Sequence, residues 1–212
     1  MSLIPEPADD SHKIILDLCG GTGAWSKPYK DAGYDVRIVT LPDQDVLTYE
    51  PPAGVYGILA APPCTEFSLA KGARPRNLEV GMAVVAACMR IIWHCRLNGS
   101  LKFWAIENPR GLLRQFLGKP AMTFEQWQYG SISIKPTDLW GYFKAPAATV
   151  QQKPQKLEQQ HKYQHRHGVL MSNPTCPQEY ADLGLDRAAI RAITPQGFAR
   201  AFFQANSKEA TP

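Results

Sequence analysis

The sequence predicts an α/β domain with a mostly parallel central sheet and helices on both faces. Apolar runs of strand length occur at Lys13–Cys19, Val55–Ala61 and Leu101–Ile106, and their continuous apolar character is typical of strands buried on both faces. A glycine-rich turn, Gly20–Gly23, follows the first run. Segments with helical apolar spacing separate the runs, and this alternation is typical of parallel-sheet proteins.

The first half of the chain adds two helices and a strand to this pattern. Trp25–Ala32 is expected to be helical, with Pro28 in the first turn, where its missing N–H is tolerated. Asp35–Leu41 is expected to be the second strand. Asn77–Arg96 predicts a long helix, because its apolar residues form one stripe. That stripe consists of Leu78, Met82, Val85, Met89 and Ile92.

The second half predicts a short helix near Leu112–Leu117 and two strands, Phe124–Ile134 and Leu139–Phe143. The closing part, Asp186–Asn206, is expected to be helical, and Thr194-Pro195 supplies a favourable N-cap and first position. One face of this last helix is apolar and carries Phe198, Ala201, Phe202 and Ala205.

The composition is typical of a soluble globular protein. Of the 212 residues, 44% are hydrophobic and 20% are charged. We expect no apolar run long enough to span a bilayer and no signal peptide. The five cysteines lack CxxC spacing, which predicts reduced thiols, no metal and a cytoplasmic protein. Cys88 and Cys95, in the long helix, are interpreted as core residues. The net charge of +4 permits a nucleic-acid partner without establishing one.

The most informative stretch is Ile58–Ser68, a predicted buried strand that continues into a rigid loop. Pro62 and Pro63 fix φ and remove two backbone donors, so the strand ladder cannot continue. The next residue is Cys64, and a braced loop can present one side chain to a reactant at little entropic cost. A buried structural cysteine after a Pro-Pro turn is the alternative, and the loop alone favours neither interpretation.

Carboxylates end two of the predicted strands. Asp17 closes the first strand, where it can accept hydrogen bonds from an amino group or hydroxyl. Glu107 follows Leu101–Ile106, and the carboxyl ends of parallel strands are where such folds bind ligands. A polar turn before the short helix is the alternative for Glu107. The glycine turn after Asp17 is weak evidence alone, because many such turns bind nothing.

The segment Ala145–Pro177 differs in composition from the rest of the chain. It is rich in Gln, Lys, His and Pro and has no helical or strand periodicity. We interpret it as a basic surface segment that is either ordered on a polyanion or disordered without one. Its histidines, His161, His165 and His167, are interpreted as solvated or phosphate-facing side chains and not as metal ligands.

Three stretches, Asp17–Gly23, Pro62–Ser68 and Glu107–Pro109, occur in this order on the α/β pattern. Together they resemble the cytosine-5 DNA methyltransferase family, in the compact form common in bacteriophages and prophages. The resemblance covers about Lys13 to Phe143 and resumes at the final helix. The Pro-Pro-Cys sequence with Phe-Ser behind it is its specific part. The resemblance implies a Rossmann-like S-adenosylmethionine-dependent methyltransferase fold.

The resemblance also implies a reaction, which is methyl transfer from S-adenosylmethionine to carbon 5 of a flipped-out cytosine. Cys64 would add to carbon 6 and so activate carbon 5. Glu107 would support ring nitrogen 3, with its pKa raised by burial. The family's Gln-Arg-Arg stretch is not recognisable, and Lys135 is the candidate substitute. Ala61 disfavours an amino-directed methyltransferase, which carries an acidic or amide residue before Pro-Pro.

A cofactor site near the first two strands follows from the same resemblance. The glycine turn would line the methionine part, and Asp45 and Val46 would meet the adenine. Cys19 stands where the family usually has an aromatic residue, and Thr40 stands where an acidic residue usually binds the ribose. Trp25 would either cover the cofactor or belong to the core. The expected cofactor-binding residues are Asp17, Gly20, Gly21, Gly23, Trp25, Thr40, Asp45 and Val46.

The expected partner is DNA, with no membrane and no metal. We expect a catalytic core at 1–143, a small basic segment at 144–180 in place of a target-recognition domain, and a C-terminal helix at 181–212 that packs back on the core. RNA cytosine-5 methylation and a non-catalytic nucleic-acid-binding function remain alternatives. A bacterial or phage-infected cytoplasm is the expected location. The expected nucleic-acid-binding residues are Lys71, Arg74, Arg76, Lys153, Lys156, Lys162 and Arg166.

Overall fold

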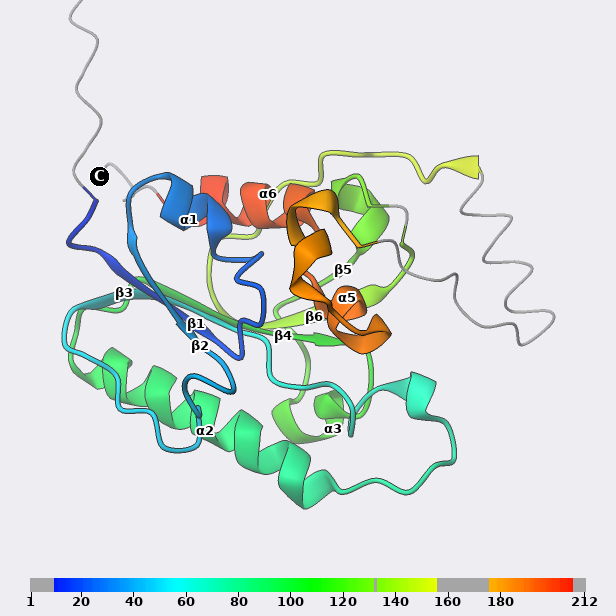
Figure 1. Cartoon of the computed structure of the whole chain (residues 1–212), viewed down its shortest axis with the longest axis horizontal. Coiled ribbons are helices and arrows are strands. Elements are labelled where there is room, and N and C mark those ends of the chain that lie inside the picture. Colours follow the sequence, from blue (N-terminus) through cyan, green and yellow to red (C-terminus); the bar gives the residue numbers. More distant parts are fainter. Residues whose placement is uncertain (1–9, 132, 156–175, 208–212) are drawn as a thin grey trace, which may run out of the picture.

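A computed structural model describes residues 10–131, 133–155 and 176–207. They form an α/β fold around one six-stranded sheet with the strand order β2-β1-β3-β4-β6-β5 (Figure 1). The strands are β1 (Ile14–Leu18), β2 (Asp35–Val39), β3 (Val55–Ala60), β4 (Phe103–Pro109), β5 (Met122–Glu125) and β6 (Pro136–Tyr142). The α-helices are α1 (Lys27–Asp31), α2 (Leu78–Leu97), α3 (Leu113–Leu117), α5 (Arg187–Ala192) and α6 (Gln196–Asn206).

The sheet is mixed: the expected parallel pairing joins β2, β1, β3 and β4, but not β6 to its neighbours. Strand β1 pairs in parallel with β2 and β3, and β3 pairs in parallel with β4. Strand β6 runs antiparallel to both of its neighbours, β4 and β5. The segment 126–135 that joins β5 to β6 is short. Adjacent parallel strands need a longer crossover, so β5 and β6 run antiparallel. The α/β class itself is confirmed.

Helices cover both faces of the sheet (Figure 1). Helices α1 and α6 share one apolar cluster with strand residues such as Ile15 and Leu59. Helix α2 packs against the other face, where Leu16 and Ile58 point. Cys88 and Cys95 of α2 are buried in this second cluster, as expected. Consecutive strand residues thus enter opposite cores, which explains the continuous apolar runs in the sequence.

Several expected boundaries were wrong in the second half of the chain. Phe124–Ile134 is not a strand: β5 ends at Glu125 and a 3₁₀ helix, η2 (Gln126–Tyr129), follows. Glu125 and Gln128 form a capping box there: the Glu125 side chain accepts from the Gln128 N–H, and the Gln128 side chain accepts from the Glu125 N–H. Strand β6 begins at Pro136, earlier than expected. Asp186–Asn206 holds two helices, α5 and α6, separated at Thr194-Pro195 because proline cannot continue the first helix.

Helix α2 corrects the expectation about membrane-spanning length. Its 20 residues are long and apolar enough to cross a bilayer by length and composition, and it is the one such helix among the residues that the structure describes. Its inner face, including Ile91 and Ile92, is buried against the sheet. A core helix of a globular domain passes the same length and composition test, and in this structure the buried face of α2 packs against the sheet.

Candidate active site

The loop after β3 holds Cys64 in a fixed turn. The Ala61 N–H donates to the Leu18 carbonyl at 2.9 Å, which ties the start of the loop to the end of β1. The carbonyl of Cys64 then accepts hydrogen bonds from Phe67 N at 3.0 Å and Ser68 N at 2.8 Å. Phe67 is completely buried, and the Cys64 side chain is half-buried. The thiol therefore has a defined position and partial access to solvent.

Asn108 fastens this loop to β4. Its side chain is completely buried, and its Nδ2 donates to the Pro62 carbonyl at 2.9 Å. Its Oδ1 is also buried and has no hydrogen-bond partner among the described residues. Glu107 precedes Asn108 on β4, so the same strand that anchors the loop also carries the second predicted catalytic residue. The expected strand-end carboxylate thus lies beside the Pro-Pro-Cys loop.

Lys135 completes the predicted group of three. It lies directly before β6, is half-buried, and its Nζ donates to the Arg191 carbonyl at 3.5 Å. The positive charge of Lys135 lowers the pKa of both Cys64 and Glu107. Strand β4 lies between β3 and β6, and its last residue, Pro109, pairs with Thr137 of β6, so the Cys64 loop, Glu107 and Lys135 lie at the same end of three neighbouring strands. Their chain positions are far apart, so the sheet is what assembles them.

The net pKa shifts of Cys64 and Glu107 are upward. Burial raises the pKa of the Cys64 thiol, and the negative charge of Glu107 adds to this effect. Lys135 and, more weakly, Arg191 act in the opposite direction. Burial also raises the pKa of Glu107, again against the field of Lys135. A protonated Glu107 no longer opposes ionisation of the thiol, so the neutral acid and the thiolate are mutually compatible.

A buried ion pair supports the strand beside this group, and the sequence analysis missed it. Asp138 on β6 is completely buried and pairs with Asn108 of β4 in the sheet register. Arg114 of α3 donates to both of its carboxylate oxygens at 2.6 Å, and Thr123 donates to Oδ1 at 2.7 Å. The charge of Asp138 further raises the pKa of Glu107. The sequence placed Asp138 between two expected strands, Phe124–Ile134 and Leu139–Phe143, and so gave no sign of its buried position in β6.

Asp17 and the glycine turn lie at the end of β1. Asp17 is completely buried, and Ser26 Oγ donates to its Oδ2 at 2.6 Å. Burial raises the pKa of Asp17 to about 6, partly offset by the Ser26 hydrogen bonds. A Cβ on Gly20 would lie 2.5 Å from the Asp17 carboxyl carbon, whereas one on Gly21 would meet no atom of the described residues within 4 Å. The turn therefore packs on Asp17 and faces open space.

The other expected cofactor residues divide between surface and core. Asp45 is half-buried and accepts a hydrogen bond from Leu47 N at 2.9 Å. Thr40 is half-buried at the end of β2, and Val46 is buried with the α2 cluster. Trp25 is 2% exposed and packs edge-to-face on Phe202, so the core interpretation holds for this residue. Gly23 packs against Ile38 of β2.

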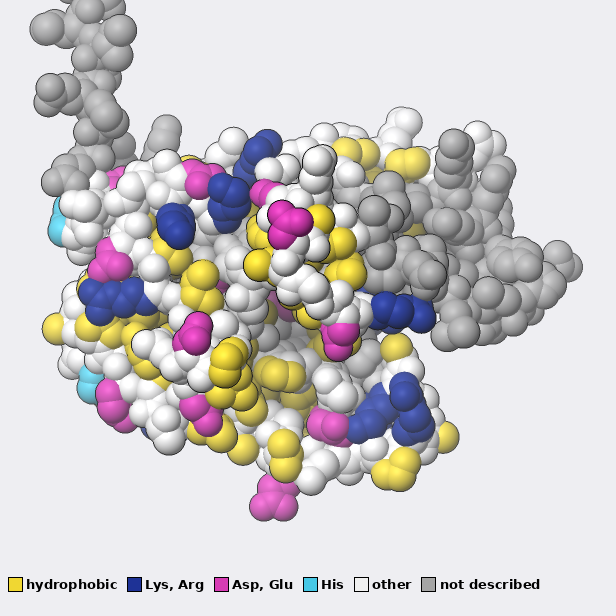
Figure 2. All heavy atoms as spheres, in the orientation of Figure 1, with side chains coloured by type: hydrophobic (Ala, Val, Ile, Leu, Met, Phe, Trp, Pro, Cys, Tyr) yellow, Lys and Arg dark blue, Asp and Glu magenta, His cyan; other side chains and the backbone are white. Residues whose placement is uncertain are grey.

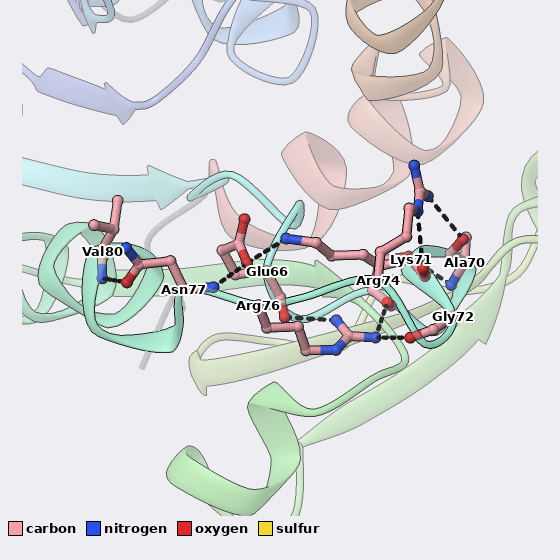
Figure 3. A network of polar contacts seen from close by, with 9 residues as sticks. Glu66, Ala70, Lys71, Gly72, Arg74, Arg76, Asn77 and Val80 are labelled. Carbon is pink, nitrogen blue, oxygen red and sulfur yellow. Dashed lines mark hydrogen bonds and ion pairs between the residues drawn. The ribbon is translucent and has the colours of Figure 1, made fainter.

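The basic residues of the 66–77 loop hold that loop together (Figure 3). Arg76 donates to the carbonyls of Glu66 at 2.6 Å and Ser68 at 3.0 Å, and Lys71 pairs with the Glu66 carboxylate. Arg74 is exposed and donates to the Lys71 carbonyl at 3.0 Å. On the face in Figure 2, Lys and Arg side chains gather over this loop. They form a positive surface, but all three cations also have partners within the loop.

The second expected group of cations lies mostly outside the described residues. Lys156, Lys162 and Arg166 belong to the range 156–175, which the structure does not describe. Lys153 is described, and it pairs with Glu125 at 2.9 Å and lies over the Trp127 ring at 5.9 Å. Its charge is therefore partly neutralised at the surface.

No protein-family model matches this sequence, and a search of curated proteins finds no match either.

Within residues 10–131, 133–155 and 176–207, no three His, Cys, Asp or Glu side chains form a group that could hold a metal ion. What the site can do follows from its own side chains: a thiol, a protonatable carboxyl group and an ammonium group lie beside a glycine turn with a buried carboxyl group.

Proposed function

We propose that this chain transfers a methyl group from S-adenosylmethionine to carbon 5 of cytosine in DNA. The observation that carries the proposal is the convergence of Cys64, Glu107 and Lys135 at one edge of the sheet. A half-buried thiol beside a carboxyl group of raised pKa is the combination that nucleophilic addition to a pyrimidine needs. The resemblance of the Pro-Pro-Cys loop to cytosine-5 methyltransferases supports the same reading.

The sheet order supports a Rossmann-like methyltransferase fold. Strands β2 and β3 lie on opposite sides of β1, which creates a switch point between β1 and β3. In open α/β sheets, ligands bind in the crevice at the carboxyl ends of the strands at such a point. The glycine turn follows β1 and the Cys64 loop follows β3, so a cofactor and a base bound there would be neighbours. The reversed strand β6 lies on the far side of β4 from this point.

The residues at the end of β1 fit S-adenosylmethionine. The Oδ1 atom of Asp17 is buried without a hydrogen-bond partner among the described residues, which suits an amino group or hydroxyl of a ligand. Gly20 and Gly21 let a ligand approach the backbone, and Thr40 and Asp45 offer polar contacts at the neighbouring strand and loop. When bound, S-adenosylmethionine would supply the methyl group.

The reaction assigns one role to each catalytic side chain. The Cys64 thiolate adds to cytosine carbon 6, which gives carbon 5 enamine character. Glu107 in its protonated form donates to ring nitrogen 3, where negative charge develops. Lys135 stabilises the thiolate and contributes positive charge near the base. Once carbon 5 carries the methyl group, a base removes its proton, the bond to Cys64 breaks and Glu107 regains its proton from ring nitrogen 3, which restores the aromatic ring.

The substrate has to reach Cys64 outside a base stack. A cytosine inside a duplex cannot contact the thiol, so the base would be flipped out or taken from a single strand. The positive 66–77 loop begins immediately beyond the Cys64 turn, which would place its charge near the flanking phosphates. Single-stranded RNA would meet the same residues, so the test includes it as an outcome.

Trapping with 5-fluorocytosine tests the proposal. Fluorine at carbon 5 removes the proton whose loss releases the enzyme, so the covalent adduct should persist after methyl transfer. We expect a denaturation-resistant complex on long mixed-sequence DNA with S-adenosylmethionine, mapped to Cys64. Cys64→Ser should abolish it, because a hydroxyl is scarcely ionised near neutral pH. Cys95→Ser is the matched control and should retain it. An adduct on RNA alone would change the substrate.

A non-catalytic nucleic-acid-binding function is the second candidate. The observation that favours it is the raised pKa of Cys64, because an activated nucleophile usually has a lowered one. Under this alternative, S-adenosylmethionine or nucleic acid would bind, yet neither methylated cytosine nor an adduct would form on DNA or RNA. Bisulfite sequencing of DNA from cells that express the protein separates the two candidates.

A further inference from the structure

Helix α2 carries a second apolar stripe, on the side that faces away from the sheet. Its inner residues, such as Ile91 and Cys95, are buried in the core. On the outer side, Trp93 is 59% exposed and Leu97 is 70% exposed. The helix lies at the outer edge of the molecule, and no other described helix lies beyond it (Figure 1). A helix that is apolar on both sides is normally covered on both, and large exposed apolar side chains in a row mark an interaction surface.

The outward-facing residues follow the spacing of a coiled-coil seam. They recur at alternating intervals of four and three residues, which keeps them on one line of the helix. This outer seam consists of Glu79, Ala83, Ala86, Arg90, Trp93 and Leu97. All of these residues are exposed, and most of them are apolar. Because α2 has 20 residues, the outer seam follows a helix that is about 30 Å long.

The outer seam is complementary in shape to an antiparallel copy of itself. Its small residues, Ala83 and Ala86, lie in the N-terminal half of α2, and Trp93 lies in the C-terminal half. In an antiparallel pair, each Trp93 ring therefore faces the alanines of the other copy, where the small side chains leave room for it. A parallel pair would set the two Trp93 rings against each other and leave the alanines facing alanines.

The charges of α2 favour the same direction. Glu79 lies in the first turn and Arg96 in the last, and both are exposed without an ion-pair partner among the described residues. An antiparallel pair brings Glu79 of each copy beside Arg96 of the other and opposes the two helix dipoles, whereas a parallel pair would place like charges together. Arg90, the other charged residue of the outer seam besides Glu79, is paired with Glu50 at 2.9 Å, which offsets its charge.

We propose that the outer seam of α2 is a dimer interface and that its occupant is the antiparallel α2 of a second copy of this chain. Such a contact is isologous, because the same surface of each copy meets the other across a two-fold axis. A contact about 30 Å long and about one helix, or 10 Å, wide is smaller than a standard interface of about 1,600 Å². We therefore expect a weak dimer that dissociates at micromolar concentration. The inference goes beyond the proposed function and does not depend on it.

Sedimentation velocity of the full chain tests the interface. Between about 1 µM and about 200 µM we expect a monomer–dimer equilibrium. Trp93→Lys and Leu97→Lys should each weaken dimerisation about tenfold or more, because a charge replaces an apolar contact. Leu183→Lys is the matched control: Leu183 is 58% exposed but lies on the 3₁₀ helix η3 (Gln178–Leu183), so this variant should dimerise like the wild type. Circular dichroism checks that each variant is folded.

Exchange of charges tests the direction of the pair. Glu79→Arg and Arg96→Glu should each weaken the dimer about threefold, because each places like charges together across the antiparallel contact. The double variant should dimerise like the wild type, since the same pair forms with its charges exchanged. Losses that add in the double variant would overturn the antiparallel arrangement.

Three other results would overturn the proposal. The first is a monomer at every concentration, and the second is a dimer that both Trp93→Lys and Leu97→Lys leave intact. The third is co-sedimentation of the wild type with phosphatidylcholine vesicles in place of self-association, which would make a lipid surface the occupant of the outer seam.

Discussion

Asp17 is a completely buried carboxylic acid with a pKa raised to about 6. Because its folded-state pKa exceeds its ordinary value of 3.8, the folded state binds this proton more tightly than the unfolded state does. The resulting stabilisation is fully present below about pH 3.8 and is lost as the pH rises through about 6. The carboxyl group thus makes the protein less stable near neutral pH, which is understandable if a ligand supplies its missing partner.

Replacing Asp17 by asparagine should remove this pH dependence. The difference between 3.8 and about 6 corresponds to about 3 kcal/mol. Relative to wild type, Asp17→Asn should therefore gain up to about 3 kcal/mol in unfolding free energy between about pH 4 and pH 7. Urea unfolding across this range measures the difference. Asp43→Asn, in an exposed loop, should keep the wild-type curve. Parallel curves for wild type and Asp17→Asn would contradict the raised pKa.

The pKa of Cys64 provides a second measurement at the residue scale. Lys135 is the main influence that lowers it, and Arg191 contributes less. Lys135→Met should move the midpoint of Cys64 alkylation to higher pH, and Arg191→Met should move it in the same direction by less. Arg187→Met, on the same helix as Arg191, should leave the midpoint in place. Alkylation by iodoacetamide, read at the Cys64 peptide, measures all three. An unchanged midpoint in Lys135→Met would mean that Lys135 lies too far away.

At the scale of elements, Arg76 stabilises the 66–77 loop through three backbone carbonyls, those of Glu66, Ser68 and Gly72. Arg76→Ala should release these bonds, so the amides of Lys71 and Gly72 should exchange roughly tenfold faster with solvent deuterium. Hydrogen-exchange mass spectrometry measures this. Arg90→Ala is the control, because Arg90 contacts Glu50 and the Tyr49 carbonyl in a different loop. Equal exchange in Arg76→Ala and wild type would show that the network contributes nothing to loop order.

The elements differ in how far the sequence predicted them. Strands β1, β3 and β4 were predictable because strands buried on both faces need continuous apolar runs. The direction of β6 was not predictable, because it depends on pairing with β4 and not on local composition. Phe124–Ile134 was misread for a similar reason. Its first residues pair with β6, and the capping box at Glu125 then diverts the chain into η2.

The residues of the candidate site were predictable where a sequence motif identified them. Cys64 follows a recognisable strand and Glu107 lies near the end of another, so their proximity followed from the expected sheet. Arg191 and the Arg114–Asp138 pair had no such signal, because their contacts join segments far apart in the chain.

At the scale of the whole molecule, α6 closes one face of the sheet. Its C-terminal end is held by Tyr34, whose hydroxyl donates to the Ser207 carbonyl at 2.8 Å. Asn206 donates to the Lys144 carbonyl at 3.0 Å and accepts from the Lys144 N–H at 2.8 Å. Residues near both ends of the described chain therefore share one core, and the domain is expected to unfold as a unit.

Phe202→Ala tests this cooperativity. Phe202 is completely buried, and its ring lies 5.4 Å from that of Trp25 and 6.0 Å from that of Phe103. Its truncation leaves a cavity between α6, α1 and the sheet, so the unfolding free energy should fall by about 3–5 kcal/mol. Gln204→Ala, at an exposed position on the same helix, should change it by less than about 0.5 kcal/mol. Urea unfolding followed by circular dichroism and by tryptophan fluorescence measures both variants. If α6 is integral to the core, the two signals of Phe202→Ala shift together; a fluorescence transition that precedes the loss of circular dichroism would mean that α6 detaches while the sheet persists.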